Sequence, residues 1–244
     1  MSMEFPNESS EYRAARERLL AKEVELRRLT ESVAVARRDL PQGGLLKEDY
    51  VFDEANASGD FVKTRLSELF APGGNSLLIY NFMFPRDPED DRPPSTGSAT
   101  RRLKLAEQPC PSCVGLLDQL DGAARHATQR VNFAVVAKTP IATLHAFGKE
   151  RGWKYLRLLS ASGNSFKHDY GGESAEGAQR PMMNVFERRG AEIRHFWTSE
   201  MMCAPPDAEQ DPRHMGTLDP LWNLFDLTRE GRPGDWNEQL SYPG

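Results

Sequence analysis

Residues 8–38 carry apolar side chains three to five positions apart, with charges of both signs between them. These apolar positions are Tyr12, Ala15, Leu19, Val24 and Leu29. The spacing predicts one long helix with an apolar stripe, which Pro41 and the pair Gly43–Gly44 end. We expect the stripe to pack on its own domain or on a second subunit, so that a homo-oligomer is possible.

Shorter apolar runs follow this helix and alternate with helical patterns. Seven of the runs predict strands, at residues 50–52, 61–64, 76–84, 131–137, 155–160, 183–188 and 193–198. Glycine-containing turns join the first two runs and the last two runs, so each of these pairs predicts a hairpin. Helical patterns occupy residues 110–128, 139–151 and 217–227. This order predicts an α/β fold, with a mixed sheet and helices on both faces.

Two polar segments that are rich in proline, residues 85–109 and 200–213, interrupt this order. Their composition predicts surface insertions, the first of them mobile. We therefore divide the chain into an N-terminal helical extension at 1–45, a domain at 46–232 that holds both insertions, and a C-terminal tail at 233–244.

Charge and apolar content exclude several classes of function. The chain has 31 Lys and Arg against 36 Asp and Glu, a formal net charge of -5, so it has no basic field to hold nucleic acid. The longest strongly apolar stretch, residues 77–84, is far too short to cross a bilayer. The first six residues lack the basic and apolar regions of a signal peptide. We expect a cytoplasmic protein with neither a nucleic-acid nor a membrane partner, whose three cysteines form no disulfide framework.

Two of the cysteines lie three positions apart, in Cys110-Pro111-Ser112-Cys113, where a helical pattern begins. The first turn of a helix has unpaired N–H groups and favours negative charge, which would lower the pKa of the Cys110 thiol from about 8.5. Residues three apart on a helix have Cβ atoms about 5–6 Å apart, close enough for a disulfide. We predict that Cys110 is the nucleophile and that Cys113, one turn further in, resolves the mixed disulfide.

Two structural interpretations of the pair stay open: a chance pair of small buried cysteines, and half of a zinc site. Zinc would need further ligands from Cys203, His195 or His214, and none of these has ligand spacing. Glycines in the chain also lack the strand–GxGxxG–helix context of a nicotinamide or flavin site. We therefore predict neither a metal nor a cofactor, and electrons from an external reductant.

A second signal is Arg180-Pro181-Met182, immediately before an apolar strand. A proline at such a position can hold a cis peptide bond. Arg180 beside it would attract an anionic partner. We predict that Pro181 is a cis-proline facing the two cysteines.

This series of elements resembles the thioredoxin fold: a strand, a helix headed by two cysteines, a βα unit, then a proline before a hairpin and a final helix. The resemblance implies a three-layer α/β/α domain, here extended by the long helix, a hairpin and inserted loops. It implies a cis-proline loop that packs against an active-site disulfide and offers backbone groups to a bound partner chain. Matched by position, Cys110 is the nucleophile, Cys113 the resolving thiol and Pro181 the cis-proline, with substrate contacts at Pro111, Ser112, Arg180 and Met182.

Nearly the whole chain is similar to an uncharacterised, mainly bacterial thioredoxin-like family classed as predicted dithiol–disulfide oxidoreductases. The similarity rests on residues 12–38, 47–53, 78–84, 109–113 and 224–232. It implies thiol–disulfide exchange with a disulfide-containing protein or a small thiol compound. The chain departs from thioredoxins at Pro109, where an aromatic residue is usual, at the insertion 85–109, and at Met182, where threonine is usual.

Two other functions remain open. The hairpin and the loop inserted before the cysteines also resemble peroxiredoxins, which reduce peroxides. Peroxiredoxins place Thr or Ser three residues before the reactive cysteine, whereas this chain has Glu107, whose carboxylate would repel a thiolate. The other alternative is a non-catalytic binding module that uses the fold and the long helix.

Overall fold

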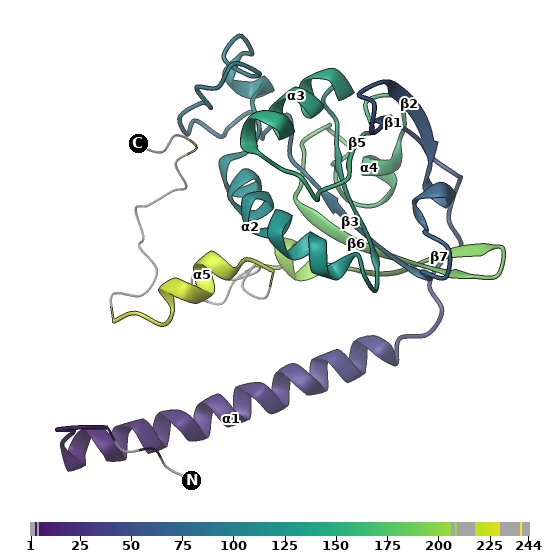
Figure 1. Ribbon diagram of the computed structural model, residues 1–244. Helices are drawn as coiled ribbons and strands as arrows, with labels where there is room; N and C mark the ends of the chain where they lie inside the picture. Colours follow the sequence, from purple (N-terminus) through teal and green to yellow (C-terminus); the bar gives the residue numbers. More distant parts are fainter. Residues whose placement is uncertain (1–2, 4, 206–207, 209–217, 230–239, 241–244) are drawn as a thin grey trace. The chain divides into compact units, whose positions relative to one another are not determined.

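The computed structural model describes residues 3, 5–205, 208, 218–229 and 240. The chain divides into two compact units, residues 1–43 and residues 44–244 (Figure 1). Residues 206–207 and 209–213 of the insertion 200–213, and the tail 233–244 apart from residue 240, lie outside the described residues. No helix among the described residues is both long enough and apolar enough to span a membrane.

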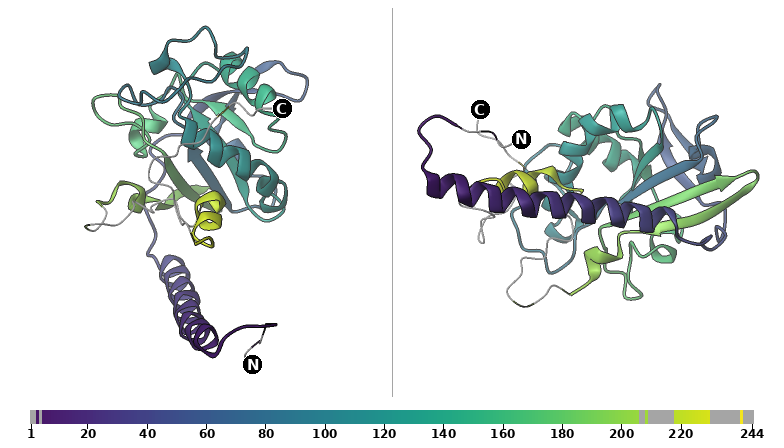
Figure 2. Two further views of the ribbon diagram at one scale, coloured as in Figure 1. Left: turned by 90° about the vertical axis from the view of Figure 1, so that its left-hand side faces the viewer. Right: turned by 90° about the horizontal axis from the view of Figure 1, so that it is seen from below.

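The first unit consists mainly of helix α1, Ser10–Arg38, which confirms the predicted helix and runs without a break (Figure 2). Ser9 caps its start, because the Ser9 hydroxyl accepts a hydrogen bond from the N–H of Tyr12 at 3.1 Å. Arg37 and Arg38 lie in the last turn, where positive charge is favourable. None of the residues of α1 is buried, and Leu26 is 63% exposed. That the apolar stripe packs on its own domain or on a second subunit stays a prediction.

In the second unit, the described residues form one mixed sheet of seven strands in the order β2-β1-β5-β4-β3-β6-β7. The pairs β3–β4 and β4–β5 are parallel, and the other pairs are antiparallel. The strands are β1 Val51–Ala55, β2 Phe61–Arg65, β3 Ser76–Asn81, β4 Asn132–Ala137, β5 Leu158–Ser160, β6 Met182–Arg189 and β7 Glu192–Thr198.

Helices lie on both faces of this sheet (Figure 1). They are α2 Pro111–Ala127, α3 Ile141–Arg151 and α4 Phe166–Asp169. Helix α5, Pro220–Phe225, is joined to α2 by the Leu221 N–H, which donates to the Gln119 side chain at 2.7 Å. Short 3₁₀ turns are η1 Leu66–Leu69, η2 Leu105–Glu107 and η3 Glu200–Cys203. The order β3-α2-β4-α3-β5, followed by the antiparallel pair β6–β7, confirms the predicted α/β/α fold of thioredoxin-like type.

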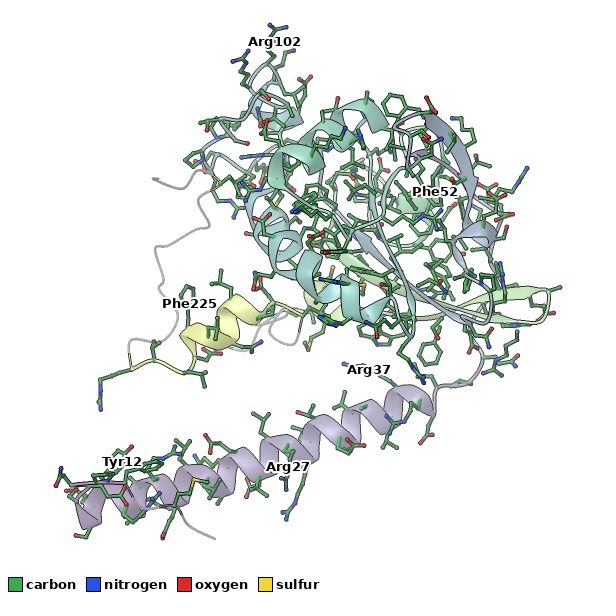
Figure 3. All side chains as sticks on the ribbon, in the orientation of Figure 1. Tyr12, Arg27, Arg37, Phe52, Arg102 and Phe225 are labelled. Carbon is green, nitrogen blue, oxygen red and sulfur yellow. The ribbon has the colours of Figure 1, made fainter. Side chains whose placement is uncertain are left out.

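Two hydrophobic clusters fill the space between the sheet and its two helical layers. Alternate residues of a strand point to opposite faces, so Phe133 and Val135 of β4 join one cluster while Ala134 and Val136 join the other. The first cluster includes the buried residues of α2 and α3 and both cysteines of the predicted site. The second includes residues of η1 and α4, and it holds Phe52, whose ring points into the interior (Figure 3).

Element bounds differ from the predictions where the chain leaves the sheet. Strand β3 ends at Asn81, not residue 84, because the Phe84 carbonyl turns to accept the N–H groups of Lys138 and Thr139 at 3.0 and 2.8 Å. Strand β5 is shorter than predicted, and α5 spans fewer residues than the pattern 217–227. The helix predicted over 139–151 begins at Ile141, with Pro140 as its N-cap.

Many residues of the predicted surface insertion 85–109 are exposed, but part of the segment is buried. Four of its polar side chains are buried: Arg86, Ser95, Thr100 and Gln108. The segment closes on itself, because the Arg86 N–H donates to the Gln108 carbonyl at 2.8 Å and the Gln108 amide donates to the Thr100 carbonyl at 2.7 Å. Only part of it, such as Arg102, projects into solvent (Figure 3). Its polar composition therefore reflects internal hydrogen bonding and not solvent exposure alone.

Candidate functional site

Cys110 is the residue that caps the N-terminus of α2. The chain leaves β3, passes through the insertion and returns so that the Cys110 N–H donates to the Met83 carbonyl at 2.9 Å. Pro111 is the first helical residue, where the missing N–H of proline costs nothing. The helix begins at the cysteine pair, as the sequence predicts, and this hydrogen bond fixes its start beside the residues that follow β3.

The Cys113 sulfur lies one turn further along and faces the sheet. Cys113 is 3% exposed, and its thiol is free, as is that of Cys110. The Tyr80 hydroxyl donates to its sulfur at 3.2 Å, and a backbone hydrogen bond from Met83 lowers the pKa of the thiol. Burial is the largest cause that raises the pKa of Cys113, and the neighbouring Cys110 raises it further. Cys113 is therefore a protonated thiol at neutral pH.

The pKa of Cys110 shifts in the opposite direction, to about 7. The largest cause is a hydrogen bond from the Cys113 thiol, and the backbone N–H of Cys113 adds another. The positive charge of Arg92 lowers the pKa further, while burial and Asp90 oppose the shift. The shift has the direction that the sequence predicts for a cysteine at the start of a helix.

Arg92 comes from the insertion and contacts the Cys110 sulfur from outside the helix. One terminal nitrogen of its guanidinium lies 3.4 Å from Cys110 Sγ, and the other donates to the Ser112 hydroxyl at 2.7 Å. Asp90 holds the guanidinium with two hydrogen bonds of 2.8 Å. This ion pair lowers the pKa of Asp90 and raises that of Arg92. The half-buried Ser112, predicted as a substrate contact, is thus a partner of Arg92.

Arg86 is buried beneath this arrangement, with 1% of its surface exposed. Its guanidinium donates to the carbonyl of Arg92 at 2.7 Å and to the carbonyl of Pro109 at 2.9 Å. Asp90 lies 3.9 Å away, and burial lowers the pKa of Arg86. Arg86 therefore ties the middle of the insertion to the residue before Cys110.

Lys167 of α4 is the other buried cation near the cysteines. Its ammonium donates to the Phe82 carbonyl at 2.7 Å. Burial lowers the pKa of Lys167 to about 7, against the opposing influence of Cys113 and Glu173. Arg92 therefore contacts the Cys110 sulfur, and the charge of Lys167 is influenced by Cys113.

The predicted cis peptide bond before Pro181 is wrong. Within the described residues the cis bond lies at Phe84–Pro85. Just before β6, the Arg180 N–H donates to the Gly172 carbonyl at 3.0 Å. This bond fixes the approach of the chain to the strand, and an X–Pro bond is cis in only about 5–6% of cases in folded proteins.

Residues 180–182 nevertheless lie at the end of the sheet where α2 begins. Strand β6 runs antiparallel to β3, with Met182 opposite Asn81. Arg180 is exposed, Pro181 is half-buried and Met182 is buried, with its sulfur accepting a hydrogen bond from the Ser199 hydroxyl at 3.5 Å. Their roles as substrate contacts stay predictions, as does that of the buried Pro111.

The alternative zinc ligands are not brought together in the described part of the chain. His195 faces Asn184, with 3.0 Å between its ring nitrogen and the amide oxygen, and Cys203 is exposed. His214 lies outside the described residues. No group of three or more His, Cys, Asp or Glu side chains among the described residues is placed to hold a metal ion.

Four residues of the site were not predicted from the sequence: Tyr80, Arg86, Arg92 and Lys167. Tyr80 lies in a predicted strand, and alternation could have placed it on the face of the sheet that meets α2. The other three lie in polar segments, where a charged residue is normally solvated, so no sequence signal separates them from their neighbours.

The fold and the site together define a thioredoxin-like α/β protein with a cysteine pair at the start of a helix. The chain belongs to a family described as bacterial protein of unknown function (DUF899), whose model matches residues 2–242. A comparison with curated proteins found no match.

Among solved structures, the chain is similar to peroxiredoxins at low identity. Reduced Prx3 from Vibrio vulnificus in complex with hydrogen peroxide is 15% identical, over 70% of this chain and 92% of that one, with a TM-score of 0.40. Peroxidoxin BcpB from Mycobacterium tuberculosis is 14% identical over 74% and 95%, with a TM-score of 0.41. A mutant of Xanthomonas campestris peroxiredoxin Q is 12% identical over 75% and 99%, with a TM-score of 0.44.

Proposed function

We propose that the protein is a thiol–disulfide oxidoreductase that uses Cys110 and Cys113 as its redox pair. The observation that carries the proposal is the unequal environment of the two sulfurs. Cys110 lies at a helix N-terminus against Arg92, and its pKa is lowered to about 7. Cys113 is buried behind it, and its pKa is raised. One thiol is therefore ready to attack at neutral pH while the other is held in reserve.

In the forward reaction the Cys110 thiolate attacks one sulfur of a substrate disulfide, and the other substrate sulfur leaves as a thiolate. Cys113 then loses its proton and attacks the Cys110 sulfur of the mixed disulfide. The Cys110–Cys113 bond forms, and the second substrate sulfur leaves. The substrate gains two electrons, and the protein loses them. An external thiol or reductase, which the expected cytoplasmic location would supply, returns the electrons.

A second candidate, peroxide reduction, is favoured by the small exposed fraction of Cys110, 3%. A hydroperoxide is much smaller than a protein disulfide and needs less access to the sulfur. The thiolate would take the terminal oxygen to give sulfenic acid, with an alcohol or water leaving after protonation. Cys113 would then displace water to form the disulfide. The expected repulsion by Glu107 has little support, because its carboxylate accepts the Lys104 N–H at 3.0 Å and the charges acting on Cys110 are Arg92 and Asp90.

One set of variants tests both candidates. The reduced protein is mixed with oxidised glutathione or with hydrogen peroxide at equal concentration, and its oxidation is followed by mass spectrometry. We expect Cys110→Ser to abolish reaction at Cys113 with either oxidant, because Cys113 alone is a buried thiol whose pKa is raised. Cys113→Ser should stop at the mixed disulfide or, with peroxide, at a sulfenic acid that dimedone traps. The matched control Cys203→Ser removes an exposed cysteine and should behave as the parent.

The faster oxidant identifies the reaction. Faster reaction with glutathione disulfide supports exchange, and faster reaction with peroxide supports the second candidate. Reaction of Cys113 in Cys110→Ser with either oxidant, at the rate of the parent, would refute both. If neither oxidant reacts with the parent, the third interpretation, a non-catalytic binding module, replaces them.

A further inference from the structure

Lys167 is a fully buried lysine that has no role in the exchange reaction as described above. It lies in α4, within a polar, glycine-containing stretch, and 1% of its surface is exposed. A buried ammonium is costly unless it is well hydrogen-bonded or paired. Its ammonium donates to the Phe82 carbonyl at 2.7 Å, and the N–H of Phe84 donates to the same oxygen at 3.0 Å.

The Phe82 carbonyl belongs to the same peptide group as the N–H of Met83. That N–H donates to the Cys113 sulfur. Lys167 and Cys113 therefore bind opposite ends of one planar amide. Hydrogen bonds in such a chain polarise one another, and a dry interior strengthens each of them. A positive charge on the oxygen side makes the N–H a stronger donor to a negative sulfur.

We propose that Lys167 is a positioning residue that favours the thiolate of Cys113 through the Phe82–Met83 peptide and so speeds its attack on the mixed disulfide. The inference rests on the proposed function, because the step is the second half of thiol–disulfide exchange. Cys113 gives up its proton, its sulfur bonds to the Cys110 sulfur, and the substrate sulfur leaves with the electron pair of the broken bond.

The charges around the two groups are consistent with this role. Lys167 faces Cys113 and Glu173, which raise its pKa, and Lys138, which lowers it and is itself paired with Glu173. Cys113 faces Cys110 and the Tyr80 hydroxyl in addition to the peptide. Ionisation of Cys113 favours the protonated form of Lys167, so that each charge stabilises the other.

The test separates the two sulfurs by kinetics in the full chain carrying Cys203→Ser. Dithiodipyridine, a small neutral disulfide, releases one thiopyridone when Cys110 attacks and a second when Cys113 resolves the mixed disulfide. Stopped-flow absorbance therefore reports two phases. We expect Lys167→Met to slow the second phase about tenfold, the change in thiolate fraction for one pKa unit, and to leave the first phase unchanged. Lys167→Arg, which keeps the donor and its charge, should restore most of the rate. The matched control Lys138→Met should not slow it.

A second readout measures the pKa of Cys113 directly. In a Cys110→Ser background, the ultraviolet absorbance of the thiolate is followed against pH, with and without Lys167→Met. The substitution should move the titration of Cys113 to higher pH. An unchanged titration, an unchanged second phase, or an equal slowing of both phases would overturn the inference. Release of a single thiopyridone by the parent would instead refute the proposed exchange, and the titration then decides the role of Lys167 by itself.

Discussion

The two sulfurs of the site have different kinds of neighbours. Cys110 faces the insertion 85–109, from which Arg92 reaches its sulfur. Cys113 faces the central sheet, where Tyr80 and the backbone of Met83 contact it. The first environment is built from polar side chains of a loop, and the second from a strand and the residues that follow it.

This difference teaches how one fold can give two identical thiols different acidities. The sheet excludes water from Cys113, and desolvation disfavours its charged form. The loop brings a guanidinium to Cys110, and a nearby opposite charge favours the charged form. Substitutions on one side should therefore change one sulfur and spare the other.

The largest effect is expected at Arg86, because its loss would remove the hydrogen bonds that hold the insertion beside Cys110. Arg86→Met leaves the buried carbonyls of Arg92 and Pro109 without their donor. We expect the free energy of unfolding to fall by roughly 2–4 kcal/mol, measured by urea denaturation. Arg102→Met, at an exposed position of the same insertion, is the control and should change it by less than about 0.5 kcal/mol. Equal stability of the two variants would show that Arg86 does not hold the insertion.

A smaller, local effect is expected at Arg92. Arg92→Gln removes a positive charge beside Cys110, so the pKa of Cys110 should rise from about 7 by about one unit. A higher pKa leaves less thiolate at neutral pH. In a Cys203→Ser background, the midpoint of the iodoacetamide rate against pH should therefore move upward. The titration of Cys113 should stay close to its position in the parent. An unchanged midpoint for Cys110 would contradict the role of Arg92.

The smallest effect is expected at Tyr80, on the sheet side. Tyr80→Phe removes one hydrogen bond to the Cys113 sulfur and keeps the buried ring. The pKa of Cys113 should rise further, and resolution of the mixed disulfide should slow about twofold to fivefold, as expected for one modest hydrogen bond. Stopped-flow release of the second thiopyridone measures this. Tyr155→Phe, at an exposed ring, serves as the control, and similar rates in both variants would remove Tyr80 from the mechanism.

The sequence was sufficient for the parts of the molecule that depend on local periodicity. The long helix, the alternation of strands and helices, and the cysteine pair at the start of α2 were all predicted from residue types and spacing. The unequal acidity of the cysteines also follows in part, because a helix N-terminus favours negative charge whatever the fold around it.

Features that depend on distant contacts were not predictable. Arg86 and Lys167 are buried because backbone carbonyls accept their hydrogen bonds, and carbonyl direction leaves no trace in the side-chain pattern. Arg92 looked like one charge among many in a polar segment. The prediction of a cis peptide bond before Pro181 failed for a related reason. Whether this bond is cis depends on how the preceding chain is anchored, here through Arg180 and Gly172.

Met83 binds both cysteines through its main chain, one by its carbonyl oxygen and the other by its N–H. A point substitution at this position changes the side chain but leaves both of those groups in place. The methionine can therefore be exchanged for another apolar residue during evolution without releasing either cysteine, so the spacing of the redox pair is tied to the course of the polypeptide and not to the identity of residue 83.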